Sequence, residues 1–286
     1  MNVANGIGSP VDEGFTVYEH KSGWAALDLR ELWKYHELLY FLTWRDILVR
    51  YKQAVLGVAW AILQPLLTMV VFTLVFNRGL GVTSASAGLP YAVFSFAGLL
   101  PWQFFAGALT RSGASLVGNA NLLTKVYFPR LVIPLSAVLG GLLDLAISFL
   151  VLLVLMAAYG IAPTWHIIFL PLFVILAVTT SMAVSLWLSA LDVLYRDVQY
   201  IIPFFVQLGM FVCPVLLPLS KFPGGMMRLV FELNPMTGVI GGFRWAILGQ
   251  QFPGSYMWIS IAVVVALLFG GALYFKRMER IFADVV

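Results

Sequence analysis

Residues 131–159 read LVIPLSAVLGGLLDLAISFLVLLVLMAAY, and this stretch decides the fold. Its only side chain that is charged at neutral pH is Asp144. A helix needs about 20 apolar residues to cross the hydrocarbon core of a bilayer, because each residue rises about 1.5 Å. The stretch is long enough and apolar enough to do so. The sequence therefore predicts a membrane-spanning helix here.

Further apolar runs of spanning length lie on both sides of this one. They are residues 55–76, 91–110, 167–191, 201–219 and 257–275. The whole chain is 61% hydrophobic and only 10% charged, a composition that the core of a water-soluble protein cannot absorb. We therefore predict an all-α integral membrane protein with six transmembrane helices.

Basic residues are distributed unevenly around these six helices. Lys and Arg concentrate in the N-terminal segment, the second and fourth loops and the C-terminal tail. The positive-inside rule places those regions in the cytoplasm, and with them both termini. Lys221, Arg228 and Arg244 weaken this bias without reversing it. The net charge of +4 gives no support for nucleic-acid binding.

The chain divides into three predicted regions. Residues 1–54 form a cytoplasmic N-terminal segment, residues 55–275 the transmembrane domain and residues 276–286 a cytoplasmic tail. Within the first region, residues 29–52 contain no Pro or Gly, and Leu32, Leu39, Leu42 and Val49 recur at helical spacing. We predict an amphipathic helix that lies along the membrane surface, packs on its own protein, or does both.

Two short apolar segments separate the fifth and sixth predicted helices. Residues 226–233 and 239–248 are bounded by several Gly and Pro residues, which interrupt any long helix. Each segment is too short to span a bilayer. The sequence therefore predicts a pair of short helices that re-enter the outer leaflet.

Motifs for chemistry within this chain are missing from the sequence. It has no G-x-x-x-x-G-K-[ST] loop to hold nucleotide phosphates. His20, His36 and His166 are scattered, and no Cys or carboxylate cluster has metal-ligand spacing. We therefore expect a protein that is not an enzyme, with no metal and no cofactor of its own. A secondary transporter would need intramembrane charge pairs, for which Asp144 alone is a candidate.

Asp144 lies deep in the predicted third span, where a charge is unfavourable. Gly140 and Gly141 lie one turn earlier and predict a close helix contact, across which Asp144 can bond. A functional role is the alternative, but no His, Glu or Lys lies at a comparable depth. Proton coupling is therefore not expected.

Four stretches resemble one known family. They are RYKQAVLGVAWAILQP at residues 50–65, NLLTKVYFPR at 121–130, LDVLYRDV at 191–198, and NPMT at 234–237 with FRW at 243–245. In this order relative to six spans, they resemble the permease subunit of the ABC-2 polysaccharide exporters, which move O-antigen, capsule and teichoic-acid chains. The resemblance covers roughly residues 30 to 280.

The resemblance implies a particular assembly. A homodimer of such permeases in the bacterial cytoplasmic (inner) membrane joins two copies of a separate ATPase subunit, which holds ATP and Mg. The substrate implied is a lipid-linked polysaccharide, O-antigen first, as part of lipopolysaccharide biosynthesis. Teichoic acid is an alternative substrate, as is a small drug or lipid.

The resemblance also implies where the ATPase subunit docks. The surface comprises residues 29–52, 115–130 and 192–200, whose charges either couple the two subunits or merely solvate the loops. Asp192 and Arg196 are spaced for pairing across one helical turn. The candidate coupling residues are Arg45, Asn121, Lys125, Arg130, Asp192, Arg196 and Asp197.

A conduit for sugar chains needs hydrogen-bonding groups and aromatic rings on one helix face. The first and fifth predicted helices have such residues at helical spacing, and the family lines its conduit with these two helices. The alternative is that the same side chains face lipid or bridge helices. The candidate channel residues are Trp60, Gln64, Thr68, Tyr200, Phe204, Gln207 and Phe211.

The short segments after the fifth helix resemble the gate helices of these exporters. An apolar constriction can close a pore by excluding water. The alternative is an ordinary outer loop half-buried in lipid. The candidate gate residues are Met226, Met227, Phe231, Met236 and Phe243.

Overall fold

The structure is a computed structural model that describes residues 29–52, 57–79, 88–126, 128–219 and 225–285. Every regular element in these ranges is a helix, which confirms the all-α prediction. Predictions for residues 1–28 lie outside the described residues. The boundaries at residues 54 and 275 stay predictions.

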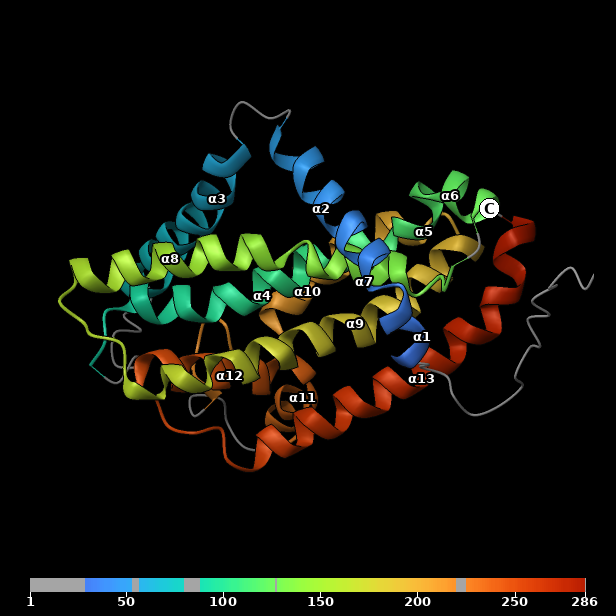
Figure 1. Cartoon of the computed structure of the whole chain (residues 1–286). Helices are drawn as coiled ribbons and strands as arrows, with labels where there is room; N and C mark the ends of the chain where they lie inside the picture. The colour runs from blue at the N-terminus through green and yellow to red at the C-terminus, as the bar shows by residue number, and fades with distance from the viewer. Residues whose placement is uncertain (1–28, 53–56, 80–87, 127, 220–224, 286) are drawn as a thin grey trace, which may run out of the picture.

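The predicted amphipathic helix is divided into α1 (Leu29–Lys34) and α2 (His36–Lys52). The α2 helix packs against α7 (Val132–Leu139), and Leu42 is the buried residue that its described positions include. Val49, on the same predicted apolar face, is 63% exposed. The predicted contact of this helix with the membrane surface stays a prediction. The α2 helix then continues towards α3, with which it forms an inverted V above α4 and α8 (Figure 1).

Five helical segments in the described residues are long and apolar enough to cross a membrane. They match five of the six predicted spans within a few residues. The third is interrupted at Gly140 and Gly141. The segments are α3 (Gly57–Phe72) with η1 (Thr73–Gly79), α4 (Tyr91–Gly113), α7 with α8 (Leu142–Ala158), η3 (Trp165–Phe169) with α9 (Leu170–Leu194), and α13 (Ser255–Val285).

The predicted fifth span, residues 201–219, is observed as the shorter helix α10 (Val198–Phe211). Its predicted extent is therefore wrong. Pro214 and Pro218 follow the end of α10, and proline lacks an N–H and disfavours a helical conformation of the residue before it. The apolar run continues, but its regular helix ends at Phe211.

Arg244 donates hydrogen bonds to main-chain carbonyl groups in the segment that follows α10. It lies on α12 (Pro235–Leu248) and is only 5% exposed. Its guanidinium donates to the carbonyl oxygen of Pro214 at 2.6 Å, to that of Val215, and to that of Phe94 at 3.3 Å. It also lies 3.7 Å from the centroid of the Phe94 ring. This one side chain therefore joins α12, α4 and the segment after α10.

The two short helices expected before the last span are present as α11 (Met226–Leu233) and α12. Asn234 begins α12 by accepting a hydrogen bond from the Met236 N–H at 3.0 Å, as an N-cap residue does. Gly249 ends it in a left-handed conformation with φ of 66°. The predicted bounds of α11 are confirmed, whereas α12 begins four residues earlier than predicted.

The α4 helix is the centre of the bundle. Residues 91–102 of α4 are all buried, and the helix contacts α3, α7, α8, α9, α10 and α12. Two short helices, α5 (Ser115–Gly118) and α6 (Ala120–Lys125), follow it. Figure 1 shows α5, α6 and the C-terminus at one end of the bundle, the α5–α6 end, and the connection between α8 and α9 at the other, the α8–α9 end.

Candidate functional site

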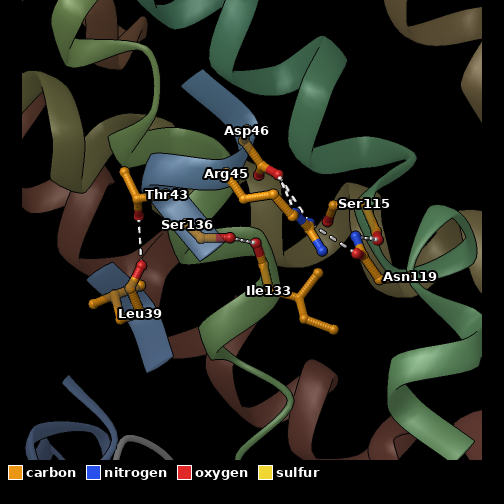
Figure 2. Close-up of polar contacts among 8 residues, drawn as sticks. All are labelled: Leu39, Thr43, Arg45, Asp46, Ser115, Asn119, Ile133 and Ser136. Carbon is orange, nitrogen blue, oxygen red and sulfur yellow. Dashed lines mark hydrogen bonds and ion pairs between the residues drawn. The ribbon is translucent and has the colours of Figure 1, made fainter. Parts of the chain in front are cut away.

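The α2 helix is joined to the α5–α6 end through Arg45 (Figure 2). The Arg45 guanidinium donates to Asn119 Oδ1 at 2.9 Å and pairs with Asp46 at 2.8 Å. Asn119 is itself held by a bond from its Nδ2 to the Ser115 carbonyl oxygen at 2.8 Å. The candidate coupling residue Arg45 therefore bridges α2 to the turn between α5 and α6. Sequence reasoning missed Asn119, because 74 residues separate it from Arg45.

The other candidate coupling residues of this region differ in exposure. Asn121 and Lys125 are exposed on α6. Arg130 contacts its own chain, because it donates to the Glu279 carbonyl oxygen and its guanidinium carbon lies 5.8 Å from the centroid of the buried Phe282 ring. Arg130 thus ties the loop before α7 to the end of α13.

The predicted pair of Asp192 and Arg196 does not form. The α9 helix ends at Leu194 and Tyr195 is extended, so the two residues are not one helical turn apart. Asp192 is only 2% exposed, and its Oδ1 has no hydrogen-bond partner among the described residues. Its predicted place on an exposed docking surface is therefore wrong. Arg196 and Asp197 are exposed just before α10.

The candidate channel residues lie on α3 and α10. The α3 and α10 helices both pack against α4 and leave large faces uncovered within this chain. Thr68 is half-buried and donates to the Gln64 carbonyl oxygen at 2.8 Å. The other six candidates are exposed: Trp60, Gln64, Tyr200, Phe204, Gln207 and Phe211.

The chemical character of these faces differs from that of α8 and α9. The side-chain amides of Gln64 and Gln207 make no hydrogen bond within the described part of the chain. The large exposed side chains of α8 and α9, such as Val154 and Ile175, are mainly aliphatic. An amide without a partner is unfavourable in hydrocarbon. The two exposed amides are thus poorly suited to lipid, although α3 also exposes aliphatic side chains such as Leu67 and Val71. The exposed aliphatic side chains of α8 and α9 are well suited to lipid.

The candidate gate residues do not form one exposed apolar surface. Phe231, Met236 and Phe243 are buried within the subunit, whereas Met226 is 77% exposed. Met227 lies on α11, but its side chain is outside the described residues. The prediction that all five line an opening is therefore wrong for the three buried residues, which pack in the interior.

An ionic cluster at the end of α2 was not predicted from the sequence. Asp144 accepts hydrogen bonds from Arg50 and from the Tyr51 hydroxyl, and Arg111 lies 3.7 Å away. This confirms the expectation that Asp144 bonds across a helix interface. Burial and the bond to Asp144 raise the pKa of Tyr51 to about 12, so its hydroxyl remains a donor. The partners were missed because 94 residues separate Arg50 from Asp144.

Comparisons with known proteins agree with the resemblance seen in the sequence. The model of the ABC-2 type transporter family matches residues 37–248. The O-antigen export system permease protein RfbA of Myxococcus xanthus is 33% identical over 261 residues, which cover 90% of this chain and 98% of that protein.

More distant relatives carry related names. An O-antigen export system permease protein RfbA of Klebsiella pneumoniae is 30% identical, over 87% of this chain and 95% of its own length. The polysialic acid transport protein KpsM of Escherichia coli is 25% identical, over 82% of this chain and 91% of its own length.

Proposed function

The chain belongs to the ABC-2 type transporter family, and from that premise we propose that it is the membrane permease of an exporter that secretes a lipid-linked polysaccharide. O-antigen is the proposed polymer, because relatives with this name are 30% and 33% identical over most of the chain. A separate ATPase subunit would supply the energy.

The observation that carries the proposal is the exposure of an amide and an aromatic ring on α3, and of an amide and several aromatic rings on α10. Gln64 and Gln207 offer exposed amides, and Trp60 and Phe204 offer exposed rings. Sugar hydroxyls can bond to such amides, and the C–H faces of sugar rings can pack on aromatic rings. Weak contacts of this kind suit a long polymer that must slide, since a tight site would hold it.

The proposed topology has six crossings with both termini in the cytoplasm. The α10 helix and the segment after it would together make the fifth crossing, with Arg244 satisfying main-chain carbonyls at the break. The α11 and α12 helices would re-enter the outer leaflet. This topology places the α5–α6 end in the cytoplasm, where the basic residues of the second loop lie.

The proposed assembly is a homodimer with two ATPase subunits. Within one chain the faces of α3 and α10 are open, so a closed conduit requires a second copy. The α5–α6 end would receive the ATPase, because Arg45, Lys125 and Arg196 are exposed on neighbouring elements there.

Cysteine accessibility tests the conduit. The single native cysteine, Cys213, is only 3% exposed and gives little background. Trp60→Cys and Phe204→Cys should react with a membrane-impermeant thiol reagent while polymer is being exported. The matched controls Val154→Cys and Ile175→Cys, on the aliphatic faces of α8 and α9, should stay unreactive. Protection of both test positions in every functional state would place them against lipid and contradict the conduit.

Deletion of the gene tests the activity itself. Cells without the permease should accumulate lipid-linked polymer inside and lose it from the surface, and the wild-type gene should restore export. Normal surface polymer in the deletion strain would contradict the proposed function.

A further inference from the structure

We infer that Asp144 is a positioning residue that clamps the end of α2 to α8 and α4, so that movement of α2 reaches the centre of the bundle directly. The clamp comprises Arg50, Tyr51, Arg111 and Asp144. Its existence follows from contacts within this chain. Its role in transmission rests on the proposed function, in which the ATPase moves α2.

Three separate segments meet at the Asp144 carboxylate. Arg50 and Tyr51 come from the last turn of α2, and each donates to one of the carboxylate oxygens. Arg111 comes from the last turn of α4, with its Nη1 atom 3.7 Å from Oδ2. Asp144 itself lies in the first turn of α8. The carboxylate therefore joins α2, α4 and α8 at one point.

The break between α7 and α8 makes room for this meeting. A Cβ atom on Gly141 would lie 2.2 Å from Arg111 Nη2 and 3.3 Å from the Phe104 ring. Arg111 Nε donates to the Ala137 carbonyl oxygen at 3.2 Å, a group that the interrupted helix leaves available. The glycine therefore allows Arg111 to pass between α4 and α8.

The charges favour a persistent contact. The side chains of Arg50, Arg111 and Asp144 are each only 27–28% exposed, so water screens them less than it screens a surface pair. Two guanidinium groups share a single carboxylate, and Tyr51 adds a neutral donor. Loss of the Asp144 charge would leave two arginines in mutual repulsion beside the end of α2.

The position of the clamp explains why it matters for transmission. The main body of α2 packs on α7, and the chain then enters α3 within a few residues of Tyr51. Without the clamp, a shift of α2 would pass into the bundle through α7, through α3 and through the Arg45–Asn119 hydrogen bond. With the clamp, the same shift also pulls on α4, the buried helix against which α3 and α10 both pack.

The first experiment tests the clamp without reference to transport. Hydrogen–deuterium exchange is measured on the chain in lipid nanodiscs for Asp144→Asn, Arg50→Gln and the double variant. Exchange in residues 46–52 should rise about tenfold in each single variant and no further in the double variant, because both remove the same contact. Exchange in α9 should not change, which shows that the fold is kept.

A matched control removes a different ion pair. Glu232→Gln breaks the Arg228–Glu232 pair on α11, which spans 2.8 Å, and should leave residues 46–52 unchanged. Unchanged exchange in the single variants, or effects that add in the double variant, would overturn the clamp.

The second experiment tests transmission in the complete transporter with its ATPase. Asp144→Asn should lower the amount of polymer exported per ATP hydrolysed about tenfold while ATP hydrolysis continues. The reason is that the ATPase is intact but the contact that joins α2 to α4 and α8 is weakened. Wild-type export per ATP, together with faster exchange at residues 46–52, would overturn the role in transmission. If the wild-type complex exports no polysaccharide, the proposed function fails, whereas the exchange result still decides the clamp.

Discussion

Arg244 has a buried charge and no carboxylate partner among the described residues. Its donors reach the carbonyl oxygens of Pro214, Val215 and Phe94. A Cβ on Gly98 would lie 2.4 Å from Arg244 Nη2, so the glycine on α4 makes room for the guanidinium. The arginine is thus a structural cation whose hydrogen bonds make a helix break tolerable inside an apolar bundle.

Replacing Arg244 with leucine should destabilise the protein strongly. Three carbonyl groups would lose a donor, and each unsatisfied buried group costs about 1–3 kcal/mol, so a loss of at least about 3 kcal/mol is expected. Thermal unfolding of the purified protein in nanodiscs measures it. The control Arg228→Leu removes an exposed pair on α11 and should change stability by less than about 1 kcal/mol. Equal stability of the two variants would contradict this role.

For single residues, exposure could be predicted from local spacing, whereas contacts between distant parts of the chain could not. Exposure of Trp60 and Phe204 agrees with the face expected from helical spacing, although which surface they meet is still a prediction. Hydrophobicity alone did not separate the buried Phe243 from the exposed Met226. The clamp and the contacts of Arg244 depend on residues far apart in the chain, and spacing within one segment does not bring such partners together.

Close packing of α12 on α9 depends on one small residue. A Cβ atom on Gly242 would lie 2.1 Å from the Phe173 ring, which is itself buried. The Trp245 ring centroid lies 6.0 Å from that of Phe173 and closes the same contact. The two helices therefore approach as near as a glycine permits.

Gly242→Ala should destabilise the bundle by about 1–3 kcal/mol, because the added methyl group overpacks this contact. The measurement is again thermal unfolding. Gly118→Ala at the end of α5 is the matched control, since nothing lies within 4 Å of its added Cβ. Alanine should be neutral or stabilising there by up to about 1 kcal/mol. A tolerated Gly242→Ala would mean that Phe173 can move aside.

Five spans were predictable at the element scale because hydropathy is a local property of the sequence. The short helices α11 and α12 were predictable because Gly and Pro bound them. The end of α10 at Phe211 was not predicted, since the apolar run continues to residue 219. Hydropathy does not distinguish a continuous helix from one whose end is satisfied by a distant arginine.

The α5–α6 end gathers exposed charge from several elements of the whole molecule. Arg45 on α2, Lys125 on α6 and Arg196 before α10 are exposed in this region. Reversing Arg196 to Glu should leave ATP hydrolysis in place and lower export about tenfold, as expected when a charged docking contact is lost. The control is Arg228→Glu on α11, which should export normally. Wild-type export in Arg196→Glu would remove this residue from coupling.

The open faces of α3 and α10 lead to a prediction about the number of subunits. The side chains of Gln64 and Gln207 have no hydrogen-bond partner among the residues that the structure describes, and an arrangement that faces them to lipid would be unfavourable. We therefore expect native mass spectrometry from nanodiscs to give twice the 31.6 kDa chain mass.

Replacing the amides distinguishes a conduit from a lipid-facing surface. Gln64→Leu and Gln207→Leu keep side-chain size but remove hydrogen bonding, so they should lower export severalfold and leave the dimer intact. If these faces met lipid instead, the same changes would stabilise the protein by relieving unpaired amides, and export would not fall. Val154→Gln on α8 is the inverse control and should lower stability, because it places an amide on an aliphatic face. Lower export in the two leucine variants, together with lower stability in Val154→Gln, would therefore show that α3 and α10 line a water-filled conduit and that α8 faces lipid.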